Sequence, residues 1–322
     1  MIPFETAHCV ACRTELAFDP DSQTFIAVPV EGARCANAPL VGCNWVAPAG
    51  GLCRSCALTR TRPADADGLA GLAVVEAAKR RLLFELDELG LAVVARSDAE
   101  PGGLAFDLLS SASGPVTTGH ADGVITLDLA EADAAQREQR RAQLREHYRT
   151  VLGTLRHEIG HYYQPLLAPD PSPERDACRE LFGDDRADYQ AALDDYYASG
   201  PPNDWPERFV SAYATMHPYE DWAETFAHYL HIRDTLQTAA AYGVRVHGPS
   251  LPTSDPVPLY SDPLERDDPR SMFEAWLPLT YALNALNRSM GAEDLYPFVI
   301  PPPAVRKLRF VHDLCVGSAV GS

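Results

Sequence analysis

The cysteines of this chain are concentrated near its start, and they limit how that part can fold. Six of the eight precede residue 57, in a stretch that is rich in Pro and Gly and has few long apolar runs. Such a stretch buries too little apolar surface to fold without a cross-link or a metal ion. A polar run at residues 60–68 follows it, and we interpret this run as a linker.

Four of these cysteines have a spacing that suits a structural zinc ion. Seven residues separate Cys35 from Cys43, nine separate Cys43 from Cys53, and two separate Cys53 from Cys56. Structural zinc takes four tetrahedral ligands, and a close pair such as the last two is typical of these sites. We therefore expect the four thiolates to bind one zinc ion. A set of buried free thiols is the alternative, and the clustering argues against it.

A second close pair, Cys9 and Cys12, leaves another ligand set open. This pair could combine with Cys53 and Cys56 as a plain ribbon. The start of the chain, MIPFETAHC, lacks the basic and apolar regions of an export signal. Because disulfides are rare in reducing compartments, we expect a cytoplasmic protein whose cysteines bind metal.

Charge and hydropathy exclude two classes of partner. The chain carries 27 Lys and Arg against 45 Asp and Glu, a formal net charge of -18. A nucleic-acid groove needs the opposite sign, so this balance argues against nucleic acid. The longest apolar runs are shorter than a membrane helix requires, so we expect no membrane contact. With 322 residues, 46% of them hydrophobic, the chain can bury a large core.

Hydrophobic periodicity predicts a mainly helical chain. Apolar residues three and four apart predict a long helix at 130–164, which Pro165 is expected to end. Residues 124–129 alternate between polar and apolar side chains, as a half-buried strand does. The other expected elements are helices at 72–89, 187–197, 218–242 and 271–290, a strand at 104–109 and a proline-rich loop at 249–269.

The motif HEIGH lies inside the predicted long helix. His157 and His161 are four residues apart, so both imidazoles emerge from one helix face and can bind a single metal ion. Glu158 follows His157, rotated by about 100° around the axis, and can reach a metal-bound water. A solvated helix face is the alternative, and the apolar flanks Leu155 and Ile159 argue against it.

A catalytic zinc of this kind also needs a third protein ligand and an open position for water. The predicted helix at 218–242 offers Glu220 and Glu224, on one polar stripe with His228 and His231. One carboxylate can bind the metal while the other accepts the N–H of a ligand histidine. Spacing does not decide which does which, and a merely solvated acidic stripe is the alternative.

Several blocks of the sequence resemble a bacterial family of zinc-binding metallopeptidases that carry an N-terminal zinc-ribbon domain. They are CANAPLVGCNWVAPAGGLCRSC, GGLAFDLL, GHADGVITLDLAEAD, LRHEIGHYY and HPYEDWAETFAHYLHI, and together they span nearly the whole chain. The resemblance implies an α+β, mainly helical fold. It implies a zinc ribbon at residues 1–66, followed at 67–322 by a zincin-like metallopeptidase domain with a small antiparallel sheet.

A more distant resemblance concerns the roles of single residues. In the anthrax lethal factor and the Pro-Pro endopeptidases, the zinc glutamate opens an E-x-x-A-E segment, and a tyrosine seven residues upstream faces the reacting carbonyl. Here EDWAE begins at Glu220, and Tyr213 stands seven residues before it. The similarity implies that Glu220 is the third ligand and that Glu224 supports the ligands without binding the metal itself. It also implies that Tyr213 is the oxyanion partner. The 58 residues between His161 and Glu220 are unrelated to those proteins.

Together these features predict a zinc peptidase with one catalytic and one structural zinc ion, acting on a peptide or protein. Glu158 would take a proton from the zinc-bound water as that water attacks the carbonyl. The strand at 124–129 is expected to hold an extended peptide by strand addition. The alternative function is a catalytically silent scaffold that recruits a protein partner through the ribbon. A zinc content of two ions per chain would favour the enzyme.

Overall fold

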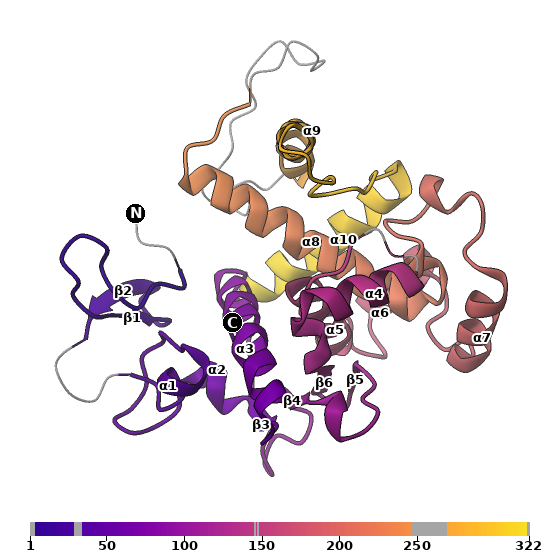
Figure 1. The fold of residues 1–322 in the computed structure, drawn as a ribbon. Coiled ribbons are helices and arrows are strands. Elements are labelled where there is room, and N and C mark those ends of the chain that lie inside the picture. The colour runs from indigo at the N-terminus through magenta and orange to yellow at the C-terminus, as the bar shows by residue number, and fades with distance from the viewer. Residues whose placement is uncertain (1–3, 29–33, 145, 147, 247–268, 321–322) are drawn as a thin grey trace. The chain divides into compact units, whose positions relative to one another are not determined.

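The computed structural model describes residues 4–28, 34–144, 146, 148–246 and 269–320. It consists of two compact units, residues 1–143 with 149–158 and residues 144–148 with 159–322. The described chain is mainly helical and contains two small sheets, which confirms the expected α+β class (Figure 1). The proline-rich loop predicted at 249–269 falls almost wholly outside the described residues.

The first unit begins with a small layer of short elements. They are the antiparallel strands β1 (Leu16–Asp19) and β2 (Thr24–Ala27) and the one-turn helices α1 (Ala38–Val41) and α2 (Arg54–Ala57). Phe18 of β1 and Trp45 are both buried, with ring centroids 5.7 Å apart. This layer therefore has its own small aromatic core, which holds the segments that carry the cysteines.

Helix α3 (Ala66–Glu88) begins earlier than the predicted helix at 72–89. Asp65 caps it, because its carboxylate accepts the backbone N–H of Gly68 at 2.7 Å. At the other end, Gly90 takes a left-handed conformation with φ 67°, which glycine adopts readily just after a helix. The stretch at 60–68, interpreted as a linker, is partly regular structure, since strand β3 (Thr59–Thr61) and the first turn of α3 overlap it.

A second sheet has the strand order β3-β4-β6-β5. Its other strands are β4 (Ala105–Leu109), β5 (Gly119–Ala121) and β6 (Val124–Asp128), close to the predicted bounds where strands were predicted. The sheet is mixed rather than antiparallel, because β3 and β6 both pair parallel to β4. The proposed strand addition at β6 is wrong: β4 pairs along one side of β6 and β5 along the other.

The long helix predicted at 130–164 is divided into three pieces. They are the short 3-10 helix η2 (Leu129–Ala132), α4 (Ala134–Leu144) and α5 (Val151–Leu167). Two capping residues cause the breaks, since Asp133 accepts the N–H of Gln136 at 2.8 Å and Thr150 accepts that of Gly153 at 3.0 Å. Apolar periodicity continues across both caps, which is why the pattern alone suggested one helix.

Helix α5 continues two residues past Pro165, so the prediction that this proline ends it is wrong. A proline in the last turn removes only one N–H donor, and the next bonds can still form, as the Ala168 N–H shows by donating to the Gln164 carbonyl at 2.9 Å. The boundary between the two units falls within α5, after Glu158. This helix therefore contributes residues to both units.

The second unit is a group of helices around α8 (Pro218–Ala241). Two of its helices, α6 and α10, were not predicted, whereas those at 189–199, 218–241 and 269–289 were. The remaining helices are α6 (Pro173–Phe182), α7 (Tyr189–Ser199), α9 (Pro269–Ser289) and α10 (Pro302–Val320), with the 3-10 helices η3 (Trp205–Glu207) and η4 (Tyr213–Thr215). Helices α6, α9 and α10 pack on α8, whose Trp222, Phe226 and Tyr229 are fully buried.

A buried ion pair fixes α10 against the first turn of α8. The Nζ of Lys307 lies 2.5 Å from the carboxylate of Asp221, and both side chains are buried. Burial raises the pKa of Asp221 to about 6, against the lowering effect of Lys307. The pair therefore anchors the residue next to Glu220 within the core of this unit.

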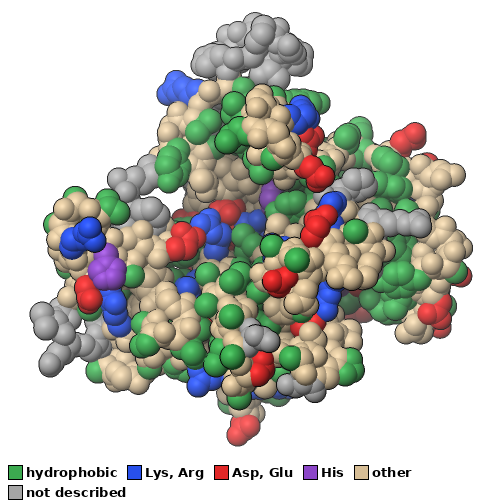
Figure 2. All heavy atoms as spheres, in the orientation of Figure 1, with side chains coloured by type: hydrophobic (Ala, Val, Ile, Leu, Met, Phe, Trp, Pro, Cys, Tyr) green, Lys and Arg blue, Asp and Glu red, His purple; other side chains and the backbone are tan. Residues whose placement is uncertain are grey.

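The visible surface carries charges of both signs in close proximity. Figure 2 shows Lys and Arg side chains interspersed with Asp and Glu on the face drawn there, without a large basic area. Among the described residues, none of the helices combines the length and apolarity that crossing a bilayer requires.

Candidate metal centres

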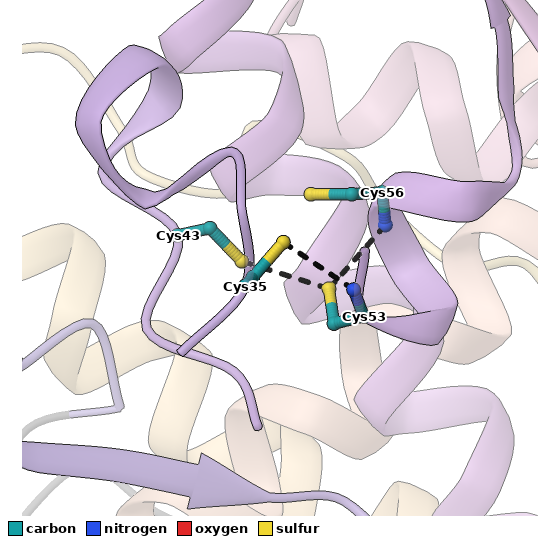
Figure 3. Close-up of side chains that lie close together, drawn as sticks. All are labelled: Cys35, Cys43, Cys53 and Cys56. Atoms are coloured by element: carbon teal, nitrogen blue, oxygen red, sulfur yellow. Dashed lines mark hydrogen bonds between the residues drawn. The ribbon is translucent and has the colours of Figure 1, made fainter. Parts of the chain in front are cut away.

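Four cysteines of the first unit form a tight group. One sulfur from each of Cys35, Cys43, Cys53 and Cys56 lies within 4.8 Å of the others, and all four residues are buried. Figure 3 shows the four side chains directed toward one another. The Sγ atoms of Cys43 and Cys53 are 3.6 Å apart. Tetrahedral coordination with Zn–S bonds of about 2.3 Å requires sulfurs separated by about 3.8 Å, so this group has the size of a zinc site.

Backbone N–H groups support these sulfurs. Cys53 N–H donates to Cys35 Sγ at 3.3 Å, and Cys56 N–H donates to Cys53 Sγ at 3.4 Å (Figure 3). The hydrogen bond with the Cys35 sulfur is the largest cause that raises the pKa of Cys53 and of Cys56 well above the usual range. Burial of both thiols is a further cause. Four thiolates cannot share this volume without a compensating cation. The donor set therefore fits a zinc ion.

The other cysteine pair lies outside this group. Cys12 is exposed and Cys9 is partly exposed. Cys9 N–H donates to the Thr14 carbonyl at 2.8 Å, and the Cys12 Sγ lies 3.1 Å from Thr14 Oγ1. The structure thus brings together the first of the two ligand sets considered from the sequence, and does not place Cys9 and Cys12 with Cys53 and Cys56.

A second ligand group is built on α5. His157 and His161 lie one turn apart on that helix, and Glu220 comes from the first turn of α8. One ligand atom of each lies within 4.8 Å of the others. His161 and Glu220 are 4% and 3% exposed, whereas His157 is half-buried. His157 is therefore the most accessible residue of the three. Two imidazole nitrogens and one carboxylate oxygen are a known ligand set of catalytic zinc.

A glycine allows α8 to approach α5 closely. A Cβ on Gly160 would lie 3.1 Å from the Ala223 Cα and 3.1 Å from the Phe226 Cβ. The Gly160 carbonyl also accepts the indole N–H of Trp222 at 2.8 Å. Because Gly160 stands next to His161 and Ala223 lies three residues after Glu220, this contact sets the separation of the two ligands.

We expect Gly160→Val to destabilise the protein by about 1–3 kcal/mol, because the added methyl groups meet backbone rather than a movable side-chain end. The same change should weaken zinc binding at the histidine site by moving Glu220 away. Thermal unfolding and zinc titration measure both effects. Gly317→Val is the matched control, since a Cβ at Gly317 of α10 meets nothing within 4 Å. Equal effects of the two variants would contradict the packing argument.

One tyrosine contacts the carboxylate of Glu220 and another stacks on the ring of His161. The Oε1 of Glu220 accepts the hydroxyl of Tyr189 at 3.0 Å, while its Oε2 lies 3.5 Å from His161 Nε2. The Tyr219 ring stacks on the His161 imidazole, with centroids 4.0 Å apart and an interplanar angle of 24°. Sequence reasoning missed both tyrosines. Tyr219 adjoins Glu220 and could have been noticed, but nothing in the sequence links Tyr189 to a residue 31 positions later.

Glu224 lies one turn after Glu220 but does not belong to the ligand group. Its Oε2 accepts the hydroxyl of Ser211. Tyr213 is close enough to Glu220 that burial and then the charge of that carboxylate raise the pKa of the phenol. The Tyr213 ring lies 5.8 Å from that of Tyr196 in α7. Tyr213 therefore lies within reach of the charge of Glu220, on the 3-10 helix η4 that precedes α8.

The two histidines further along α8 lie in an aromatic cluster. His228 Nδ1 is 2.6 Å from the Tyr296 hydroxyl, and the His231 ring stacks on the same tyrosine at 5.3 Å. The Trp276 ring meets the edge of Tyr296 at 4.9 Å. These contacts give both histidines a role in packing α8 against the chain that follows α9.

Known sequences match the chain over nearly its whole length. The family model described as "Putative zinc-binding metallo-peptidase" matches residues 69–314, and a zinc-ribbon model matches residues 1–67. Two proteins named as uncharacterised, from Mycobacterium tuberculosis and Mycobacterium bovis, are each 49% identical over 318 residues, 97% of this chain and 91% of theirs. No solved structure matches. These matches confirm the resemblance seen in the sequence: the chain belongs to the zinc-binding metallopeptidase family and carries a zinc-ribbon domain at residues 1–67.

Proposed function

We propose that this protein hydrolyses peptide bonds at a zinc ion held by His157, His161 and Glu220. The observation that carries the proposal is the convergence of two imidazoles and one carboxylate within 4.8 Å, with Glu158 next to the first histidine on the same helix. Membership of the metallopeptidase family supports it. A bound zinc ion would lower the pKa of a water in the open coordination position and polarise the substrate carbonyl.

The side chains of the chain supply the proton transfers. Glu158 accepts the proton of the attacking water and then delivers it to the leaving amine. Its side chain is 6% exposed, so little bulk water competes for that proton. Tyr213 donates a hydrogen bond to the carbonyl oxygen as negative charge develops there. Burial and then the charge of Glu220 raise the pKa of this phenol, which keeps it protonated as a donor and supports this role.

We further propose a structural zinc ion at the cysteine group, so that the chain carries two ions. The zinc ribbon would bind a protein partner or the protein substrate. We place the protein in the cytoplasm, because four of its cysteines are grouped as metal ligands are, and metal-bound thiolates fit a reducing compartment.

Zinc content tests the proposed function. We expect two zinc ions per wild-type chain, one in His161→Ala and one in Cys43→Ser, measured by elemental analysis after gel filtration. The histidine variant should keep the cysteine-bound zinc, because the two ligand groups share no residue. A single ion in the wild type that disappears on mutating Cys43 would contradict the enzyme and support the scaffold alternative.

A further inference from the structure

The two carboxylate oxygens of Glu220, the candidate third ligand, have different neighbours. Glu220 Oε2 lies on the side of His161, 3.5 Å from its Nε2. Glu220 Oε1 accepts the hydroxyl of Tyr189 at 3.0 Å. A carboxylate held through one oxygen presents the other in a fixed direction, whereas a free glutamate samples several rotamers.

We propose that Tyr189 is a positioning residue for the catalytic metal, which holds Glu220 in its ligating rotamer. This inference rests on the proposed function, since it concerns the same zinc ion. The phenol acts on the carboxylate as outer partners act on metal ligands generally: it fixes the orientation of the ligand and leaves its other oxygen directed at the metal. Tyr189 itself need touch neither the metal nor the substrate.

The start of α7 is fixed relative to the start of α8, which makes such positioning possible. His217 Nδ1 accepts the N–H of Tyr219 at 3.1 Å and thereby caps α8. Its other nitrogen, Nε2, then carries the proton and donates to the Ala187 carbonyl at 3.2 Å. The imidazole thus links the chain two residues before Tyr189 to the chain three residues before Glu220. The Tyr189 ring also packs edge-on against this histidine at 5.4 Å.

The rest of α7 adds little to this attachment. None of the residues of α7 is buried, and its N-terminus is capped by Asp188, which accepts the N–H of Ala191 at 3.0 Å. The neighbours that hold Tyr189 include the cap before it, the His217 ring beside it, the carboxylate that it contacts and the Tyr213 phenol, with which it shares a hydrogen bond. Removing the hydroxyl alone leaves the ring packing in place, so the hydrogen bond can be tested separately from the fold.

Tyr189→Phe should weaken zinc binding at the histidine site by about 10- to 100-fold, the usual effect of losing an outer partner of a metal ligand. The measurement is the zinc dissociation constant by chelator competition, with the cysteine-bound ion as an internal reference that should not change. Unfolding of the metal-free protein should be unaltered. Tyr242→Phe is the matched control, because this tyrosine at the end of α8 is 63% exposed and should leave both constants as in the wild type.

A double-mutant cycle separates positioning from a general structural effect. In a Glu220→Ala background, Tyr189→Phe should have no further effect on zinc affinity, because the carboxylate that it orients is gone. An equal loss in both backgrounds, or an unchanged constant in Tyr189→Phe, overturns the positioning role and leaves the proposed function standing. A wild-type chain that binds zinc only through its cysteines overturns both.

Discussion

We expect Glu158→Gln to retain two zinc ions per chain and to hydrolyse peptides about 10²- to 10⁴-fold more slowly than the wild type, the range that a general base contributes. Glutamine has the shape of glutamate but cannot accept a proton from water. The side chain is not among the grouped ligand atoms, so the metal content should stay unchanged. Since the substitution keeps size and polarity at a buried position, we expect the fold to be unaltered.

The measurement has two stages. A proteome-derived peptide library is incubated with wild type and variant, and mass spectrometry identifies the bonds that only the wild type cleaves. The best peptide then gives kcat/KM for both. Glu180→Gln, an exposed glutamate of α6, is the matched control and should cleave as the wild type does. Cleavage by Glu158→Gln at the wild-type rate, with zinc present, would refute the assigned base.

We expect Cys53→Ser to lose one zinc ion and to unfold the segment that carries the cysteine group. Binding of structural zinc to small domains contributes about 10–16 kcal/mol to their folding, far more than this short layer gains from its aromatic core. Cys53 has a central place because its sulfur lies 3.6 Å from that of Cys43 and accepts the N–H of Cys56 as the cap of α2. Hydrogen exchange should show loss of protection at residues 34–57.

Cys12→Ser is the matched control for this variant, because Cys12 is exposed and lies outside the grouped sulfurs. It should keep both zinc ions and the exchange pattern of the wild type. The reverse result, in which Cys12→Ser loses a zinc ion and Cys43→Ser keeps it, would favour the ligand set of Cys9, Cys12, Cys53 and Cys56. Because Cys53 belongs to both ligand sets, the comparison of Cys12→Ser with Cys43→Ser decides between the two sets that the spacing left open.

Elements with one strong local signal were predicted well. The helix at 218–242 became α8 at Pro218–Ala241, since a proline at its first turn and an apolar stripe mark it. The helix at 130–164 was predicted as one piece because the apolar periodicity continues across Asp133 and Thr150. The side chains of these two residues cap new helices, so the backbone is interrupted where the pattern is not. A buried cluster explains why the chain breaks there: Arg149 pairs with Glu131 at 2.6 Å, and Glu131 is fully buried.

The position of β6 within the sheet depends on its pairing with β4 and β5, which the residues of β6 alone do not predict. Alternation identified a strand at 124–129, but it carries no information about which strands lie beside it. Parallel pairing with β4 places β6 inside the sheet, and β5 covers its other side. An edge role in binding peptide was therefore excluded by the order of the strands.

The sequence by itself determined that His157, Glu158 and His161 share one helix, because a period of 3.6 residues fixes their directions whatever surrounds them. It also predicted that the cysteine-rich start takes a metal, since that stretch has little apolar surface for its length. Only the tertiary structure decided that Glu220 rather than Glu224 joins the histidines and that Tyr189 holds its other oxygen. Those contacts depend on how closely α8 packs at Gly160 and where α7 begins, and packing between distant segments leaves no periodic mark in a sequence.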